Sequence, residues 1–250
     1  MHKEIQAQID TKPISIKNLN INFEQKSIYK DFSIDFQENK ITAILAPSGA
    51  GKTTLLKAIS KQEKNSSFLF QNPRLLPWKT VFENLTLPLE NTNLSKEEII
   101  KRGEYFLAQV GLLDRKKDFP KTLSGGEKQR VAMARSFAYP SSLLLMDEAF
   151  QSQDLGLKLK LMEDFLQLAN SENKTVILVT HDIREAICLA DRIIVLKGSP
   201  NQIKMDIQNH LEKETLSVKE KYTSKLSLEI EEQIIKIFLE STYFFTREKN

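Results

Sequence analysis

The sequence contains very little cysteine, since Cys188 is the single one among 250 residues. One cysteine excludes an internal disulfide, and the apolar neighbours of Cys188 predict a packed thiol rather than a reactive one. Long hydrophobic runs are also lacking, because no stretch approaches the roughly 20 apolar residues that a membrane-spanning helix needs. The first twelve residues are polar and lack the hydrophobic region of a secretory leader. We therefore expect a cytoplasmic protein that meets a membrane only through partners.

A charge excess is absent as well. The 36 Lys and Arg residues nearly balance the 33 Asp and Glu residues, which leaves a formal net charge of +3. Nucleic-acid binding usually needs a concentrated basic face, so the composition gives no reason to expect a nucleic-acid partner. What the chain does have is length, since 250 residues can bury a sizeable core. The composition thus indicates an ordinary globular protein.

Two kinds of apolar pattern predict strands. Branched or alternating apolar residues at 14–23 and 32–36 are typical of strands in an antiparallel flank. Continuous apolar runs are typical of strands that are buried on both faces of a parallel sheet, and they occur at 41–45, 143–146 and 176–179.

Helical spacing of apolar residues fills the intervals, for example at 155–166. Strands that alternate with helices predict an α/β core with a parallel sheet. The sequence shows no repeats, low-complexity tracts or convincing linker. We therefore expect a single domain over residues 1–250, with a helical insertion at about 72–140 and a C-terminal helical extension at about 210–250.

A loop of small residues lies directly between a predicted strand and a predicted helix. Such a loop can crowd backbone N–H groups around a phosphate at a helix N-terminus. Lys52 would supply charge to the β- and γ-phosphates of ATP, and the Thr53 hydroxyl would ligate Mg²⁺. Ala46 stands where this motif usually has its first glycine, and we expect a negative φ there, with the methyl group pointing away from the nucleotide. The predicted nucleotide-binding residues are Ala46, Pro47, Ser48, Gly49, Ala50, Gly51, Lys52, Thr53 and Thr54.

Two acidic residues follow the apolar run at 143–146. Ligands of open α/β sheets bind at the carboxyl ends of the strands, where Asp147 and Glu148 would lie. We expect Asp147 to hold Mg²⁺ through water and Glu148 to polarise the attacking water as general base. An acidic pair on its own is more often a solvated turn, so this interpretation depends on the phosphate loop.

The segment 123–130, which reads Leu-Ser-Gly-Gly-Glu-Lys-Gln-Arg, begins another predicted helix. Ser124 can cap that helix, while Gly125 and Gly126 would let phosphate oxygens approach the backbone. This segment closely resembles the signature motif of the ABC ATPase family, and the resemblance continues in family order over most of the chain. Gln71 matches the Q-loop glutamine and Asp154 the D-loop aspartate. His181 matches the switch histidine.

The resemblance implies a P-loop NTPase core with a parallel sheet, an antiparallel N-terminal flank and an inserted helical subdomain. It implies ATP and Mg²⁺ as cofactors. Two subunits, expected to be identical, would clamp ATP, with the Ser124–Gly126 segment of one covering the phosphate loop of the other. Gln71 would sense the γ-phosphate and Mg²⁺, and His181 would contact the γ-phosphate. An aromatic residue ahead of the loop stacks on adenine in this family, and Phe23 is the best-placed candidate, with a core strand residue as the alternative.

The Leu-Leu-Pro-Trp string at 75–78 resembles importer ATPases of the nitrate, sulfonate and taurine type, a branch that includes carriers of vitamin precursors. There this segment faces the permease, whereas the alternative for Trp78 is a buried plug. The implied partners are transmembrane permease subunits and, indirectly, a solute-binding protein, with the chain peripheral at the cytoplasmic face of the cell membrane. Two further interpretations stay open: an exporter or lipid-transport ATPase, and a non-transport ABC ATPase acting on DNA or ribosomes. The sequence does not identify the solute.

Three departures from the family pattern stand out. Only nineteen positions separate Lys52 from Gln71, so an antiparallel hairpin is expected to be shortened. Ala149 replaces the proline that commonly follows the catalytic glutamate, and the D-loop at 151–154 is divergent. None of these departures removes a chemical group from the expected site.

Overall fold

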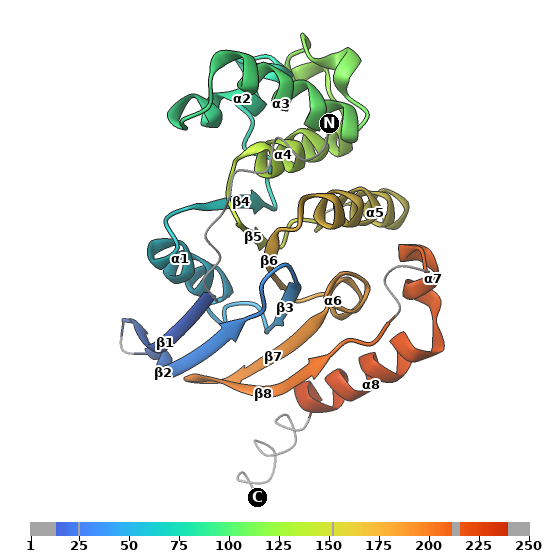
Figure 1. Ribbon diagram of the computed structural model, residues 1–250. Helices are drawn as coiled ribbons and strands as arrows, with labels where there is room; N and C mark the ends of the chain where they lie inside the picture. Colours follow the sequence, from blue (N-terminus) through green and yellow to red (C-terminus); the bar gives the residue numbers. More distant parts are fainter. Residues whose placement is uncertain (1–13, 25, 152, 212–215, 240–250) are drawn as a thin grey trace, which may run out of the picture. The chain divides into compact units, whose positions relative to one another are not determined.

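The computed structural model describes residues 14–24, 26–151, 153–211 and 216–239 (Figure 1). The expectations that fall on residues 1–13, Ser152 and 240–250 therefore lie outside the described part. The chain divides into two compact units, which are described separately below. One comprises residues 63–175, and the other comprises the described residues of 13–62 and 176–250. Among the described residues, no helix is both long and apolar enough to cross a bilayer.

The unit formed by both ends of the chain contains most of the strands. Strand β3 lies between β6 and β7 and is parallel to both, while β8 pairs antiparallel with the outer edge of β7. Strands β1 and β2 form a separate antiparallel sheet. The elements are β1 (Ile14–Phe23), β2 (Lys26–Phe36), β3 (Ile41–Leu45), α1 (Lys52–Gln62), β6 (Thr175–Thr180, whose first residue belongs to the other unit), α6 (Ile183–Leu189), β7 (Arg192–Gly198), β8 (Asn201–Gln208), α7 (Val218–Thr223) and α8 (Lys225–Leu239).

Burial explains why the central strands are continuous apolar runs. Every residue of β3 is buried, and so is every residue of β6. Strands with no solvent-facing side need apolar side chains on both faces, as the sequence predicted. At the edge, β8 alternates between more and less exposed positions. The sequence analysis predicted no strand at residues 201–208, since the helical extension that it expected begins at about residue 210.

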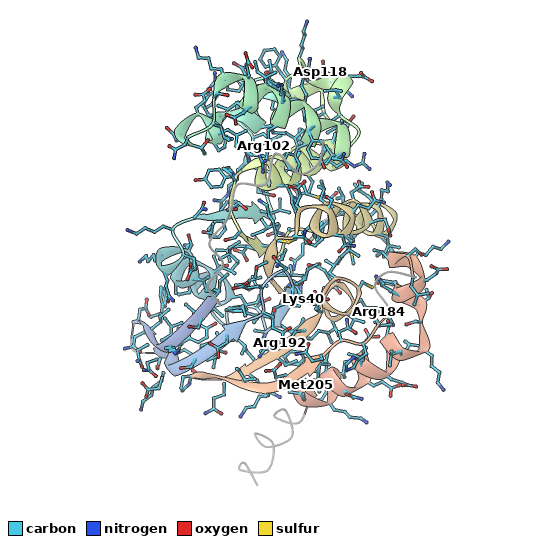
Figure 2. All side chains as sticks on the ribbon, in the orientation of Figure 1. Lys40, Arg102, Asp118, Arg184, Arg192 and Met205 are labelled. Carbon is cyan, nitrogen blue, oxygen red and sulfur yellow. The ribbon has the colours of Figure 1, made fainter. Side chains whose placement is uncertain are left out.

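Arg192 joins the two sheets of this unit. Its guanidinium makes two bonds to the carboxylate of Asp206 on β8, of 2.7 and 2.6 Å, and a third bond of 2.6 Å to the backbone oxygen of Asp35 on β2 (Figure 2). A planar guanidinium suits this bidentate arrangement. The antiparallel flank is thereby fixed beside β7 and β8.

The unit of residues 63–175 combines a parallel strand pair with packed helices. Strand β4 pairs in parallel with β5. Helices α2 and α3 both pack on α4, which also contacts α5 (Figure 1). The elements are β4 (Ser66–Phe70), α2 (Val81–Thr86), the 3₁₀ turn η1 (Leu87–Asn91), α3 (Lys96–Gln109), the 3₁₀ turns η2 (Leu113–Arg115) and η3 (Pro120–Thr122), α4 (Gly125–Ala138), β5 (Leu143–Asp147) and α5 (Leu155–Glu172).

The ends of these helices are closed by side chains. Ser95 and Glu98 form a capping box at the start of α3. At the end of α4, Arg102 donates to the backbone oxygen of Ala138 (Figure 2). The ammonium of Lys174 donates to the carbonyls of Ser136 and Tyr139, at 3.3 and 2.8 Å. Arg102 and Lys174 thus both satisfy carbonyl groups at the end of α4.

The predicted fold class is confirmed: the protein is an α/β protein in which parallel strands dominate, with an antiparallel N-terminal sheet and a group of helices. Helices α2, α3 and α4 fall inside the expected insertion at 72–140, and α7 and α8 fall inside the expected extension at 210–250.

Candidate functional site

The phosphate loop leaves β3 as a continuation of the sheet. The backbone N–H of Ala46 donates to the Thr180 oxygen of β6 at 3.5 Å, and Ala46 is 1% exposed. The methyl group of Ala46 therefore packs in the interior. The positive φ angles in this described loop belong to Gly49, at 77°, and Gly51, at 82°. Glycine thus occupies the positions where the turn needs left-handed backbone.

Lys52 opens helix α1 and folds back over the loop. Its ammonium donates to the backbone oxygens of Ala46 and Pro47, at 3.0 and 3.1 Å, and the residue is 6% exposed. A Cβ built at Gly49 would meet nothing within 4 Å. This arrangement suits a phosphate group. The Lys52 ammonium is fixed by hydrogen bonds, helix α1 begins beside it, and the space above Gly49 is open. Thr53 and Thr54 lie exposed in the first turn of α1.

Two residues that the sequence analysis did not single out anchor this loop from the same unit. The Tyr29 hydroxyl on β2 donates to the Gly51 oxygen at 3.2 Å. Burial raises the pKa of Tyr29 far above its ordinary value, so the hydroxyl stays protonated and can donate. The Asn201 amide on β8 donates to the oxygens of Ala50, at 2.6 Å, and Ile28, at 3.1 Å. Both anchors are pairings between distant segments and carry no local sequence pattern.

His181 emerges at the same sheet edge as the phosphate loop. In the parallel register Leu45 pairs with Thr180, so Ala46 and His181 each follow one of two neighbouring strand ends. His181 is exposed there. Phe23 closes β1 and is 69% exposed, which excludes the alternative of a core residue.

Gln71 and the acidic pair are neighbours in the other unit. Phe70 of β4 pairs with Asp147 of β5, so Gln71 and Glu148 directly follow two adjacent strand ends. Glu148 has a φ of 50°, which is uncommon for a residue other than glycine. Such a backbone costs on the order of 1–3 kcal/mol and persists only where surrounding structure holds it. The turn is closed by the Gln151 N–H, which donates to the Glu148 oxygen at 3.2 Å.

The signature segment caps helix α4 as predicted. The Ser124 hydroxyl accepts the Glu127 N–H at 3.3 Å, and the Glu127 carboxylate accepts the Ser124 N–H at 2.8 Å. The N–H of Ser124 lowers the pKa of the Glu127 carboxyl. A Cβ at Gly125 would enter open space, whereas one at Gly126 would lie 2.7 Å from Leu157 of α5. A Cβ at position 126 would therefore require the Leu157 side chain to move, whereas one at position 125 would meet no obstacle in this unit.

Asp154 caps the next helix. Its carboxylate accepts the Leu157 N–H at 3.0 Å, so the D-loop residue opens α5 while itself remaining exposed. Leu157 is also the residue that packs on Gly126. The starts of α4 and α5 are therefore in contact within this unit.

Trp78 lies on an exposed loop that a buried asparagine organises. The Asn84 side chain accepts the Leu76 N–H at 2.6 Å and donates to the oxygens of Leu76, Lys79 and Thr80 at 2.9–3.1 Å. Trp78 itself is 69% exposed, which excludes the alternative of a buried plug. The loop thus holds an apolar ring in solvent. Its anchor Asn84 was not singled out from the sequence.

Within the described residues, no cluster of three or more His, Cys, Asp or Glu side chains forms a metal cage. Mg²⁺ is commonly held by one or two protein groups together with substrate phosphates and water. The hydroxyl of Thr53, the amide of Gln71 and the carboxylate of Asp147 are donors of the oxygen type that Mg²⁺ prefers.

The strand–loop–helix at β3 and α1, together with an acidic pair after a parallel strand, defines a P-loop nucleotide-binding protein. The family model for ABC transporters matches residues 29–67 and 60–151. This chain is 38% identical over 196 residues to the aliphatic sulfonates import ATP-binding protein SsuB 1 of Paracoccus denitrificans. The alignment covers 74% of this chain and 79% of that relative. It is 40% identical over 198 residues to the aliphatic sulfonates import ATP-binding protein SsuB 2 of Rhizobium johnstonii, and that alignment covers 74% of this chain and 78% of the relative.

A solved structure, cbiO1 from Clostridium perfringens, described as part of the ABC transporter complex cbiONQ, shares the fold. The TM-score is 0.70 at 23% identity, over 80% of this chain and 89% of that chain. The chain belongs to the ABC transporter family, as one of its ATP-binding subunits, and it is an ATPase.

Proposed function

We propose that this chain is the ATP-hydrolysing subunit of an ABC importer and that a separate permease carries the solute. The observation that carries this proposal is its similarity to sulfonate import ATP-binding proteins over about three-quarters of the chain. The expected single ABC ATPase domain over residues 1–250, with its helical insertion and C-terminal extension, is part of this proposal.

The residues would divide the chemistry between them. Lys52 and the loop N–H groups would bind the β- and γ-phosphates, while Thr53, Gln71 and Asp147 would hold Mg²⁺, which supplies charge neutralisation when bound. Glu148 would act as general base toward the attacking water. His181 would contact the γ-phosphate and Phe23 would stack on adenine. The exposure of Phe23 and His181 supports these two roles, because each side chain can be reached by a ligand.

A second copy of the chain would complete the site. The signature segment Ser124–Gly126 of one copy would cover ATP bound to the other, and Asp154 would take part in the same contact. Supporting this, Ser124 and Gly125 are exposed, and position 125 carries no side chain although nothing in its own unit would obstruct one. A glycine that internal packing does not require is explained by the close approach of a ligand.

The Trp78 loop would face the permease at the cytoplasmic side of the membrane. An exposed tryptophan on a hydrogen-bonded loop is a typical interface anchor, because it buries a large area at little cost in conformational entropy. The solute class would be of the nitrate, sulfonate or taurine type or a vitamin precursor. It would be delivered by a solute-binding protein that this chain meets only indirectly.

The test compares two variants of the chain co-expressed with its permease. Lys52→Ala should lose ATP turnover and still co-purify with the permease, since the loop charge is not part of the docking face. Trp78→Ala should keep ATP binding but co-purify poorly. Near-normal hydrolysis by Lys52→Ala, or full co-purification of Trp78→Ala, would overturn the corresponding half of the proposal.

A further inference from the structure

One buried side chain on helix α4 contacts both loops that carry proposed catalytic groups in its unit. Gln129 is 0% exposed. Its amide nitrogen donates to the Phe70 oxygen at 3.2 Å and to the Ala149 oxygen at 2.6 Å. Phe70 directly precedes Gln71, and Ala149 directly follows Glu148. One carboxamide therefore joins the residues next to both groups.

The orientation of this amide follows from its partners. Both neighbours are carbonyl oxygens, so the donating NH₂ group must face them. The Gln129 Oε1 atom is then buried, and it finds no hydrogen-bond partner among the described residues. An unsatisfied buried acceptor is unfavourable, because it has lost its hydrogen bonds to water. A methionine would fill nearly the same volume without that cost, so packing alone does not account for glutamine at this position.

The Gln129 carboxamide holds the backbone next to a strained residue, Glu148. Glu148, with its φ of 50°, lies between Asp147, which pairs with Phe70 in the sheet, and Ala149, which Gln129 holds. A backbone in this region persists only where its flanks are fixed. The sheet fixes one flank of Glu148, and Gln129 fixes the other.

A second side chain of helix α4 contacts the loop that follows β4, further along that loop. Arg135 donates to the oxygens of Pro73, at 2.7 Å, and Arg74, at 3.2 Å. Arg74 also has a positive φ, of 47°, and its guanidinium lies over the Phe70 ring at 3.6 Å. Both loops thus carry a left-handed residue shortly after the strand, and α4 supplies a side chain to each.

We propose that Gln129 is a positioning residue that sets Gln71 and Glu148 relative to each other and ties both to the signature helix. Because α4 begins at the signature segment, a shift of that helix is transmitted through one carboxamide to both loops. This inference rests on the roles proposed above for Glu148 and Gln71. Among the described residues, Gln129 donates only to backbone oxygens, and it takes no part in the chemical step.

The experiment compares Gln129→Met with Ser136→Ala, a control on the same helix. Ser136 is also buried, and its hydroxyl donates to the Met133 oxygen at 2.7 Å, away from both loops. Misplacing a catalytic group by about 1 Å can cost about 100-fold in rate. We therefore expect Gln129→Met to lower kcat about 10- to 100-fold while the Kd for ATP changes less than about threefold. Ser136→Ala should keep the wild-type kcat.

Two further measurements separate the possible outcomes. Glu148→Gln tests the proposed function itself. If that variant hydrolyses ATP normally, the general-base role of Glu148 is wrong, whatever the effect of Gln129→Met. In the wild-type protein, NMR of ¹⁵N-labelled glutamine should show that the Gln129 side-chain NH₂ protons exchange slowly with solvent. A folded Gln129→Met variant with kcat within about twofold of wild type would overturn the inference, and so would rapid exchange of those protons.

Discussion

Two glycines of the phosphate loop allow a sharp test of what each position requires. Gly49 and Gly51 have nearly the same φ, 77° and 82°, but different surroundings. A Cβ at Gly49 would meet nothing within 4 Å, whereas a Cβ at Gly51 would lie 2.4 Å from Cγ2 of Ile28 and 3.4 Å from the Tyr29 ring. Alanine at each site therefore imposes the same backbone strain but a different steric cost.

The expected magnitudes follow from these distances. Left-handed backbone costs an alanine about 1–2 kcal/mol, and both variants incur this cost. Gly51→Ala must also displace β2 side chains, and overpacking of this kind costs about 1–3 kcal/mol. The free energy of unfolding should thus fall by about 1–2 kcal/mol in Gly49→Ala and by about 2–5 kcal/mol in Gly51→Ala.

Nucleotide affinity should show a separate effect at Gly49. The open space above Gly49 is where we place the phosphates, so its new methyl group should weaken ATP binding beyond what the small stability loss explains. Urea unfolding of the nucleotide-free variants and ATP titration at a temperature where both are folded would measure the two effects. Equal destabilisation by the two substitutions, or unchanged ATP affinity of Gly49→Ala, would refute the reasoning.

Two further predictions concern single side chains. Burial lowers the pKa of Lys174 to about 7, below its value in the unfolded chain, so the unfolded state binds more protons between pH 7 and 10. The free energy of unfolding should therefore increase with pH across that window, by at most about 1.4 kcal/mol per pH unit from Lys174. Urea unfolding at several pH values should show this increase in the wild type but not in Lys174→Met. The same dependence on pH in both proteins would contradict the prediction. Ala46→Gly should change ATP affinity less than about twofold, because the Ala46 methyl is buried away from the loop surface; a sharp gain in a binding titration would show that the methyl intrudes on the phosphate site.

The central strands could be predicted because their environment is uniform. A strand buried on both faces, such as β3 or β6, is mostly apolar, with threonine as its polar residue, and such a run is visible without any knowledge of its neighbours. Strand β8 was not predicted, although Ile203, Met205 and Ile207 alternate along it. Edge strands have short, half-exposed patterns, and their partner strand decides whether they form.

The candidate site could be predicted in its chemistry but not in its supports. Lys52, Asp147 and Ser124 belong to local motifs whose residue types follow from phosphate, metal and capping chemistry. Tyr29 and Gln129 act through hydrogen bonds to residues twenty or more positions away, and no local pattern marks such partners. Motif residues can be recognised from the neighbouring sequence, whereas the residues that hold them in place can be recognised only once the tertiary fold is known.

The backbone of Glu148 is a second feature that the sequence could not give. A glutamate has no intrinsic preference for positive φ, so its conformation follows from the sheet on one side and Gln129 on the other. The exposures of Phe23 and Trp78 also had to be observed, because an aromatic residue fits a core or an interface equally well by composition.

We propose that this chain works as an ATP-clamped dimer in which Glu148 is the general base. The most direct measurement is size-exclusion chromatography of Glu148→Gln with and without excess MgATP, together with its rate of phosphate release. The substitution keeps the size of the side chain and the ground-state contacts while removing the base. The variant should elute as a dimer only with MgATP and should release phosphate far more slowly than the wild type. A variant that stays monomeric with MgATP, or hydrolyses ATP at the wild-type rate, would contradict this account.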